Sequence, residues 1–188
     1  MKALLVIDYT NDFVATDGKL TCGERGQSIE ARITAITKSF FDHGHYVVMA
    51  VDSHEKEDRY HPEFPLFPEH NVRGTDGRTL YGTLGNLHEK IRQVKPVNLY
   101  WMDKTRYSAF AGTDLELKLR ERGISELHLT GVCTDICVLH TAVDAFNKGF
   151  SIVVHEDAVE SFDPQGHDWA LRHFQNTLGA QTVTGYQE

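Results

Sequence analysis

Residues 126–149 read ELHLTGVCTDICVLHTAVDAFNKG, a short apolar run followed by a segment with helical spacing. The run over 126–130 predicts a strand, and the spacing over 135–148 predicts a helix that a glycine ends. A strand followed at once by a helix is typical of the units that build parallel sheets. This stretch therefore predicts an α/β fold, and it places Cys133 and Cys137 where the strand gives way to the helix.

The same alternation of short apolar runs and helical spacing continues along the whole chain. Predicted strands cover residues 2–8, 46–52, 98–102, 126–130, 151–155 and 181–184. Predicted helices cover residues 28–43, 84–94, 113–122, 135–148 and 165–178. Strands that are apolar on both faces and separated by helices form a parallel sheet that is covered on both sides. We therefore expect one domain over residues 1–188, a three-layer α/β/α sandwich with a mostly parallel, doubly wound sheet of about six strands.

Composition and charge exclude several classes of function. The chain has 188 residues and is 40% hydrophobic, which is enough for one substantial core. Its formal charge of -8 leaves no basic face for phosphates, so we expect no nucleic-acid partner. The apolar run Ala3–Ile7 is too short for a signal sequence or a membrane span, so we expect a cytoplasmic protein without a membrane partner. No glycine-rich nucleotide-binding motif follows a strand. The three cysteines suggest reduced thiols.

Reactive side chains follow three of the predicted strands. In a parallel sheet, ligands bind outside the carboxyl ends of the strands. Asp8 ends the first strand, Lys104 follows the third, and Cys137 opens the helix after the fourth. Together they supply a thiol, a carboxylate that can take its proton, and a cation that keeps this carboxylate ionised. The helix start is expected to favour the Cys137 thiolate. Each residue also has an ordinary alternative, as a buried small side chain, a turn cap or a solvated lysine.

A second group of polar residues predicts a metal site. Asp52 and His54 are two residues apart, so in an extended chain both side chains leave the same face. The irregular, proline-containing stretch at about 53–83 adds Glu63 and His70. Two histidines with two carboxylates suit one divalent ion, zinc in preference to iron or manganese. The alternative is that these histidines are structural.

Five stretches, taken in order, resemble nicotinamidases of the isochorismatase-like cysteine hydrolase superfamily. They are LLVIDYTNDF (4–13), AVDSH (50–54), HPEFPLFPEH (61–70), KTRYSAFAGT (104–113) and LTGVCTDICVLHTAVDA (129–145). The resemblance covers nearly the whole chain. It implies that Asp8, Lys104 and Cys137 form the catalytic triad. It also implies a metal site of Asp52, His54, His70 and Glu63, a set that other branches of the superfamily typically lack.

The resemblance implies further roles around the thiol. The backbone amides of Cys133 and Cys137 would form an oxyanion hole, and the peptide bond before Cys133 would be cis. Phe13, Phe67 and Tyr107 match aromatic residues that line the substrate pocket, although ordinary core packing is the alternative for them. Many relatives have alanine at the position of Cys133. We expect its side chain to line the pocket, while a disulfide with Cys137 is the alternative.

The implied activity is the hydrolysis of nicotinamide to nicotinate and ammonia through a cysteine thioester, a step in NAD salvage. The metal would position the pyridine ring more than activate water. Relatives commonly self-associate, so a homo-oligomer is expected. Two alternatives stay open: hydrolysis of another small amide or of isochorismate, and a catalytically silent domain that binds or senses through its thiols.

Overall fold

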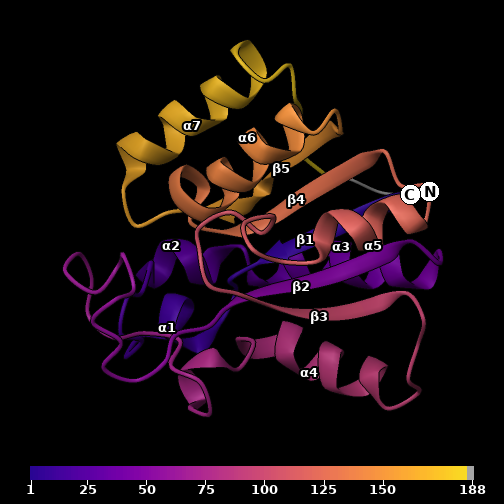
Figure 1. Ribbon diagram of the computed structural model, residues 1–188. Coiled ribbons are helices and arrows are strands. Elements are labelled where there is room, and N and C mark those ends of the chain that lie inside the picture. The colour runs from indigo at the N-terminus through magenta and orange to yellow at the C-terminus, as the bar shows by residue number, and fades with distance from the viewer. Residues whose placement is uncertain (186–188) are drawn as a thin grey trace.

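The computed structural model describes residues 1–185 and contains a six-stranded sheet (Figure 1). The strand order is β3-β2-β1-β4-β5-β6, and every neighbouring pair is parallel. The strands are β1 (Lys2–Ile7), β2 (Tyr46–Asp52), β3 (Leu99–Lys104), β4 (Glu126–Val132), β5 (Ser151–Glu160) and β6 (Gln181–Val183). This order, with β1 in the centre, confirms the predicted doubly wound sheet.

Helices cover both faces of the sheet and bury two apolar layers. The helices are α1 (Asn11–Val14), α2 (Gly23–Ser28), α3 (Glu30–Asp42), α4 (Gly82–Arg92), α5 (Leu115–Glu121), α6 (Leu139–Asn147) and α7 (Pro164–Asn176). Side chains of α3 and α4 pack in one layer, and those of α5, α6 and α7 pack in the other. Figure 1 shows α6 and α7 on the side of the sheet opposite α4. The sheet is therefore buried on both faces, as the continuous apolar strands predict.

The structure differs from the sequence prediction in a few elements. Strand β5 continues to Glu160, past the predicted end at 155, because it bends around an irregular register against β4. The short helices α1 and α2 were not predicted, since neither is long enough to show helical spacing. Residues Thr134–Val138 form a π-helical turn, η2, before α6 begins. The predicted domain of residues 1–188 includes 186–188, which lie outside the described part of the chain.

The carboxyl ends of β1, β2, β3 and β4 lie together at one edge of the sheet, and β4 approaches β1 closely there. Strand β4 ends beside β1, where Gly131 pairs with Ile7. Gly131 has φ 112°, and a Cβ there would lie 1.9 Å from the Ile7 carbonyl oxygen, so no side chain fits. On the other side of β1, Asp52 of β2 pairs with Lys104 of β3. The sheet register thus brings the ends of four strands to one edge.

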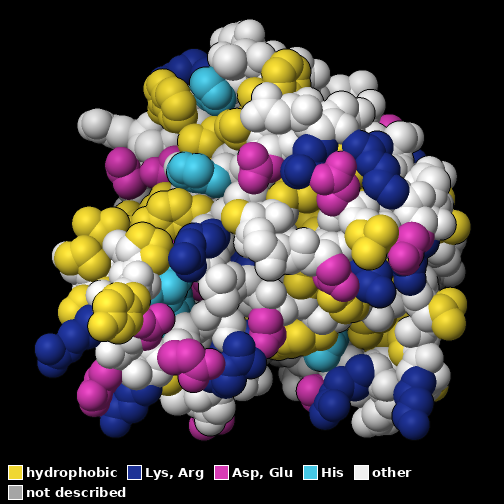
Figure 2. Space-filling view, in the orientation of Figure 1, with side chains coloured by type: hydrophobic (Ala, Val, Ile, Leu, Met, Phe, Trp, Pro, Cys, Tyr) yellow, Lys and Arg dark blue, Asp and Glu magenta, His cyan; other side chains and the backbone are white. Residues whose placement is uncertain are grey.

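The stretch 53–83 wraps over this edge with little regular structure. It contains the 3-10 turn η1 (Asp76–Arg78), a bridge between His54 and Val72, and a bridge from Leu80 to Thr10. Tyr60, Phe64 and Leu66 are exposed on it, and Figure 2 shows hydrophobic side chains at the surface on the side where Figure 1 places this stretch. Among residues 1–185, the helices are all too short or too polar to cross a membrane.

Candidate active site

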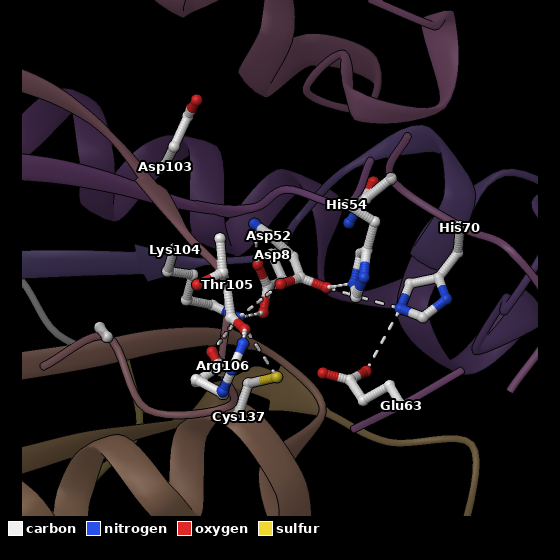
Figure 3. A network of polar contacts seen from close by, with 12 residues as sticks. Asp8, Asp52, His54, Glu63, His70, Asp103, Lys104, Thr105, Arg106 and Cys137 are labelled. Carbon is white, nitrogen blue, oxygen red and sulfur yellow. Dashed lines mark hydrogen bonds and ion pairs between the residues drawn. The ribbon is translucent and has the colours of Figure 1, made fainter. Parts of the chain in front are cut away.

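A buried lysine lies at the centre of the predicted catalytic residues (Figure 3). The Lys104 ammonium is 2.7 Å from Asp8 Oδ2, 3.5 Å from Asp52 Oδ1 and 3.6 Å from Cys137 Sγ. It also donates to the Arg106 carbonyl oxygen at 3.2 Å. The Lys104 and Asp8 side chains are fully buried. Burial alone lowers the pKa of Lys104, but the carboxylates of Asp52 and Asp8 outweigh it and raise that pKa well above the usual value. The lysine therefore stays charged.

Asp8 is held in position by its own backbone and by β2. Its φ of 54° lies in the left-handed region, which aspartate tolerates better than most residues. Its Oδ1 accepts a hydrogen bond of 2.7 Å from the Asp52 backbone amide. Burial raises the pKa of Asp8 to about 6, Lys104 opposes this, and Asp52 adds to it. At neutral pH, Asp8 is an ionised carboxylate whose proton affinity is higher than that of an exposed aspartate, which suits a general base.

Cys137 differs in one respect from the sequence prediction. The prediction of a thiolate favoured by a helix start is wrong for this environment, because burial raises the pKa of the Cys137 thiol well above its usual value. Lys104 lowers this pKa in part, and the carboxylates of Asp8 and Asp52 raise it further. Cys137 also lies inside η2, before the regular helix α6 begins. The resting thiol keeps its proton, so it needs a base to become a nucleophile.

The four predicted metal ligands converge beside this group. One ligand atom from each of Asp52, His54, Glu63 and His70 lies within 4.8 Å of the others, and all four residues come from β2 or the stretch that follows it. His54 Nε2 is 2.6 Å from Asp52 Oδ2. His70 Nε2 is 3.5 Å from Asp52 Oδ2 and 3.6 Å from Glu63 Oε2. Figure 3 shows the side chains of this set pointing toward one another.

The surroundings of His70 show that this set fits a divalent cation. Its Nδ1 lies 2.8 Å from the Pro68 carbonyl oxygen, so Nδ1 is the donor and Nε2 points toward the carboxylates. His70 Nε2 is buried, and the carboxylate oxygens of Asp52 and Glu63 that face it lie at 3.5 and 3.6 Å, beyond normal hydrogen-bonding distance. Burial lowers the pKa of His70, but Asp52 and Glu63 outweigh it and raise that pKa to about 10. A place where two carboxylates hold a proton this tightly is suited to a metal ion in its stead.

A narrow cavity connects the thiol to the metal ligands. Its volume is about 10 Å³, and it is lined by Phe13, Leu20, Asp52, Glu63, Phe67, His70, Tyr107, Cys133, Ile136, Cys137 and Phe162. The three aromatic residues predicted to contact substrate all lie in this lining. Phe13 and Phe67 both face the ring of His70, at centroid distances of 5.2 and 6.3 Å. A six-membered ring is larger than this space, so side chains of the lining must move before such a ring can enter.

Cys133 is placed by the backbone and by another cysteine. The Val132–Cys133 peptide bond is cis, as the resemblance implies. Cys133 Sγ lies 3.4 Å from Cys22 Sγ, and this contact together with burial raises the pKa of Cys133 well above its usual value. The neighbouring thiol that contacts Cys133 is therefore Cys22, a residue that the sequence prediction did not consider in the site.

Some residues that position the site were also missed in the sequence prediction. Asp12 Oδ2 accepts a 2.7 Å hydrogen bond from the backbone amide of Asn71, the residue after His70. Arg78 donates to the Asp52 carbonyl oxygen at 2.8 Å and to Asp103 at 2.7 Å. These contacts join segments far apart in sequence, and no local pattern marks them.

The chain is an α/β protein with a parallel sheet, and at the carboxyl edge of that sheet lie a buried thiol, a carboxylate and a lysine, the groups that an activated cysteine nucleophile requires. Within that class, the chain belongs to the isochorismatase family, because the model of the isochorismatase domain matches residues 2–186.

Individual relatives are similar along nearly their whole length. An isochorismatase family protein of Bacillus subtilis, PncA, is 67% identical over 97% of this chain and 98% of its own. The crystal structure of the nicotinamidase/pyrazinamidase PncA from Bacillus subtilis has a TM-score of 0.94, covering 97% of this chain and 98% of that one. A pyrazinamidase/nicotinamidase of Streptococcus mutans is 50% identical with a TM-score of 0.94, covering 97% and 100%. A pyrazinamidase of Pyrococcus horikoshii, solved in complex with zinc, is 28% identical with a TM-score of 0.84, covering 97% and 98%.

Proposed function

We propose that this protein is a nicotinamidase, which hydrolyses nicotinamide to nicotinate and ammonia through a thioester on Cys137. The observation that carries the proposal is the cavity that Cys137 shares with His70, Asp52 and Glu63. This cavity would place the carboxamide of the substrate at the Cys137 thiol and the ring of the substrate near a bound cation. Relatives of this chain at 50–63% identity are described as enzymes acting on nicotinamide and pyrazinamide, and both of these substrates are aromatic carboxamides whose ring carries a nitrogen.

Asp8 is the proposed proton carrier for both halves of the reaction. As the Cys137 sulfur attacks the carboxamide carbon, the thiol proton passes to Asp8. Asp8 returns that proton to the departing nitrogen, the C–N bond breaks, and ammonia leaves behind a thioester. A water molecule then attacks the thioester and gives a proton to Asp8. The carboxylate product leaves, and the proton restores the Cys137 thiol.

Lys104 and two backbone amides stabilise the charges that arise. Lys104 lies 2.7 Å from Asp8 and 3.6 Å from Cys137 Sγ, so it supports both the ionised base and the developing thiolate. The amides of Cys133 and Cys137 are the proposed donors to the oxyanion. The narrow cavity excludes bulk water, which strengthens each of these interactions.

Asp52, His54, Glu63 and His70 would hold one divalent metal ion, with zinc as the first choice. The ion would supply a positive charge that orients the ring nitrogen of the substrate. Phe13, Phe67 and Tyr107 then confine the ring from the sides of the cavity, which favours flat aromatic amides over aliphatic ones. A cytoplasmic location, a homo-oligomer and a single domain over residues 1–188 remain predictions.

The test is ammonia release by the purified, zinc-loaded protein from nicotinamide, pyrazinamide and an aliphatic carboxamide of similar size, with isochorismate cleavage assayed in parallel. We expect the two aromatic amides to be hydrolysed and the other two compounds to be poor substrates. Robust turnover of isochorismate or of the aliphatic amide, with none of nicotinamide, would assign the chain to another activity of the family.

A further inference from the structure

His61 connects the two halves of the candidate site. Its Nε2 lies 2.8 Å from the backbone carbonyl oxygen of Thr105, and its Nδ1 lies 3.3 Å from the backbone amide of Glu63. A carbonyl oxygen only accepts, so Nε2 carries the hydrogen and Nδ1 is left to accept from Glu63. Each ring nitrogen therefore forms a hydrogen bond with a backbone group, and the two backbone groups belong to different segments of the chain.

The two segments that His61 joins carry different parts of the chemistry. Glu63 lies in the stretch 53–83, and its carboxylate is 3.6 Å from His70 Nε2. Thr105 directly follows Lys104, whose ammonium is 2.7 Å from Asp8. Figure 3 shows Thr105 beside Lys104, and Glu63 on the side of His70. The imidazole thus spans from the metal-ligand stretch to the end of the strand that carries the catalytic lysine.

The ring of His61 also supports a ligand by direct packing. Its centroid is 4.4 Å from that of His54, with the planes at 72°. His61 is only 8% exposed, although most of its neighbours in the stretch are exposed. An edge-to-face contact restricts the rotation of both rings, and burial strengthens the two hydrogen bonds of His61. His54 and Glu63, one ligand on either side of His61 in sequence, are therefore both held by one side chain.

We propose that His61 is a positioning residue that sets the distance between the metal ligands and the Cys137 thiol by fastening the stretch 53–83 to Thr105. This inference rests on the proposed function, in which the substrate must reach both groups at once. A small displacement of a bound substrate from its nucleophile lowers the rate steeply, by roughly 100-fold for about 1 Å. Partners of metal ligands typically change metal affinity by roughly 10-fold to 100-fold when they are removed.

The test compares His61→Phe and His61→Gln with a matched control, His88→Phe. His88 is also 8% exposed, but it lies on α4 beside Trp101, away from the catalytic group. Phenylalanine keeps a ring and loses both hydrogen bonds, whereas glutamine keeps one donor and one acceptor at similar reach. Zinc affinity is measured by competition with a chromophoric chelator. The kcat and KM for nicotinamide are measured at saturating zinc, and thermal unfolding reports stability.

We expect His61→Phe to weaken zinc binding by roughly 10-fold or more and to lower kcat at saturating zinc by a similar factor. His61→Gln should recover much of both losses, and His88→Phe should change neither by more than about twofold. Zinc affinity and kcat of His61→Phe that match those of His88→Phe would overturn the proposal. If His61→Phe does not fold, His61→Gln is compared with a volume-matched His61→Leu, which keeps no hydrogen bond: losses of zinc affinity and kcat in His61→Gln as large as those in His61→Leu also overturn the proposal.

Cobalt substitution separates positioning from direct ligation. With Co²⁺ in place of zinc, the visible absorption of His61→Gln should keep the wild-type shape, because the ligand set is unchanged. A spectrum that shows the loss of a nitrogen ligand would identify His61 as a ligand and overturn the proposal. If the wild-type protein does not hydrolyse nicotinamide, the proposed function fails, while zinc affinity and the cobalt spectrum still decide the role of His61.

Discussion

The candidate site has a thiol half (Asp8, Lys104 and Cys137) and a metal half (Asp52, His54, Glu63 and His70), and the two are built in different ways. Asp8, Lys104 and Cys137 come from the ends of three strands or the turn directly after one, and the register of the sheet fixes where they meet. Glu63 and His70 lie in a stretch with almost no regular structure, so side-chain contacts must hold them. The position of the thiol group therefore depends on the stability of the sheet, whereas the position of the metal ligands depends on a few local contacts.

The largest effect should come from the thiol half. We expect Cys137→Ala to lower kcat for nicotinamide by roughly 10⁴-fold or more, because removing a nucleophile removes the whole covalent route. Zinc affinity should stay within about twofold, since Cys137 is not among the metal ligands. Ammonia release and chelator competition measure the two quantities. Cys22→Ala is the matched control, and it should keep turnover; residual turnover in Cys137→Ala near the wild-type level would remove the thiol from the mechanism.

Loss of a metal ligand should raise KM for nicotinamide more than it lowers kcat. We expect His70→Ala to weaken zinc binding and to lower kcat/KM by roughly 100-fold, mostly through a higher KM. Chelator treatment of the wild-type protein should act in the same way, and added zinc should reverse it. A variant whose KM is unchanged while kcat collapses would give the metal a role at the scissile bond and break the division between the two halves.

Acid should weaken the sheet through His155 on β5. Burial lowers the pKa of His155 to about 3, with neighbouring His128 adding to the effect. The unfolded chain takes up a proton near pH 6.5, but the folded protein does not until about pH 3. Stability should therefore fall as the pH drops from 6.5 toward 3, by up to about 1.4 kcal/mol per pH unit from this residue.

Urea unfolding at several pH values measures this slope. His155→Gln should flatten it, whereas His43→Gln, at an exposed position, should leave it unchanged. Equal slopes in His155→Gln and the wild-type protein would mean that other groups set the acid sensitivity of the sheet.

A milder effect should follow when Asp12, which holds the residue after the metal ligand His70, loses a hydrogen bond. Asp12 accepts hydrogen bonds from the amides of Asn71 and Lys19 on its two carboxylate oxygens. Asp12→Asn leaves one oxygen for two donors, so we expect zinc affinity to fall by roughly 3-fold to 10-fold. Asp17→Asn, exposed in the same segment, is the control. Equal zinc affinities in the two variants would show that Asp12 does not hold His70 in place.

The smallest effect should come from the second thiol near the nucleophile. We expect Cys133→Ala to change kcat/KM by less than about threefold, because the proposed role of Cys133 belongs to its backbone amide. Its sulfur contacts Cys22, so peptide mapping after mild peroxide treatment should show no link between Cys133 and Cys137. A Cys133–Cys137 linked peptide, or a large loss of activity in Cys133→Ala, would give that sulfur a direct part in the reaction.

The difference between the thiol half and the metal half also explains which parts of the fold and of the site could be predicted from the sequence. Strands and long helices have strong periodicity, so the sheet, its order class and the strand-end residues Asp8 and Cys137 could be predicted. Glu63 and His70 could be proposed from their residue types, but the stretch around them has no period, so only the family resemblance singled them out among its other acidic residues and histidines. His61 and Asp12 act through contacts with Thr105 and Asn71, which only the folded chain brings near. The pKa of Cys137 was predicted in the wrong direction, since burial outweighs the helix start.

The most direct test of the central claim is mass spectrometry of the zinc-loaded protein, acid-quenched during turnover of nicotinamide and then digested. The account predicts a nicotinoyl adduct on the peptide that contains Cys137, present in the wild-type protein and absent from Cys137→Ala. Full ammonia release with no adduct on any cysteine, under a quench that preserves thioesters, would contradict it.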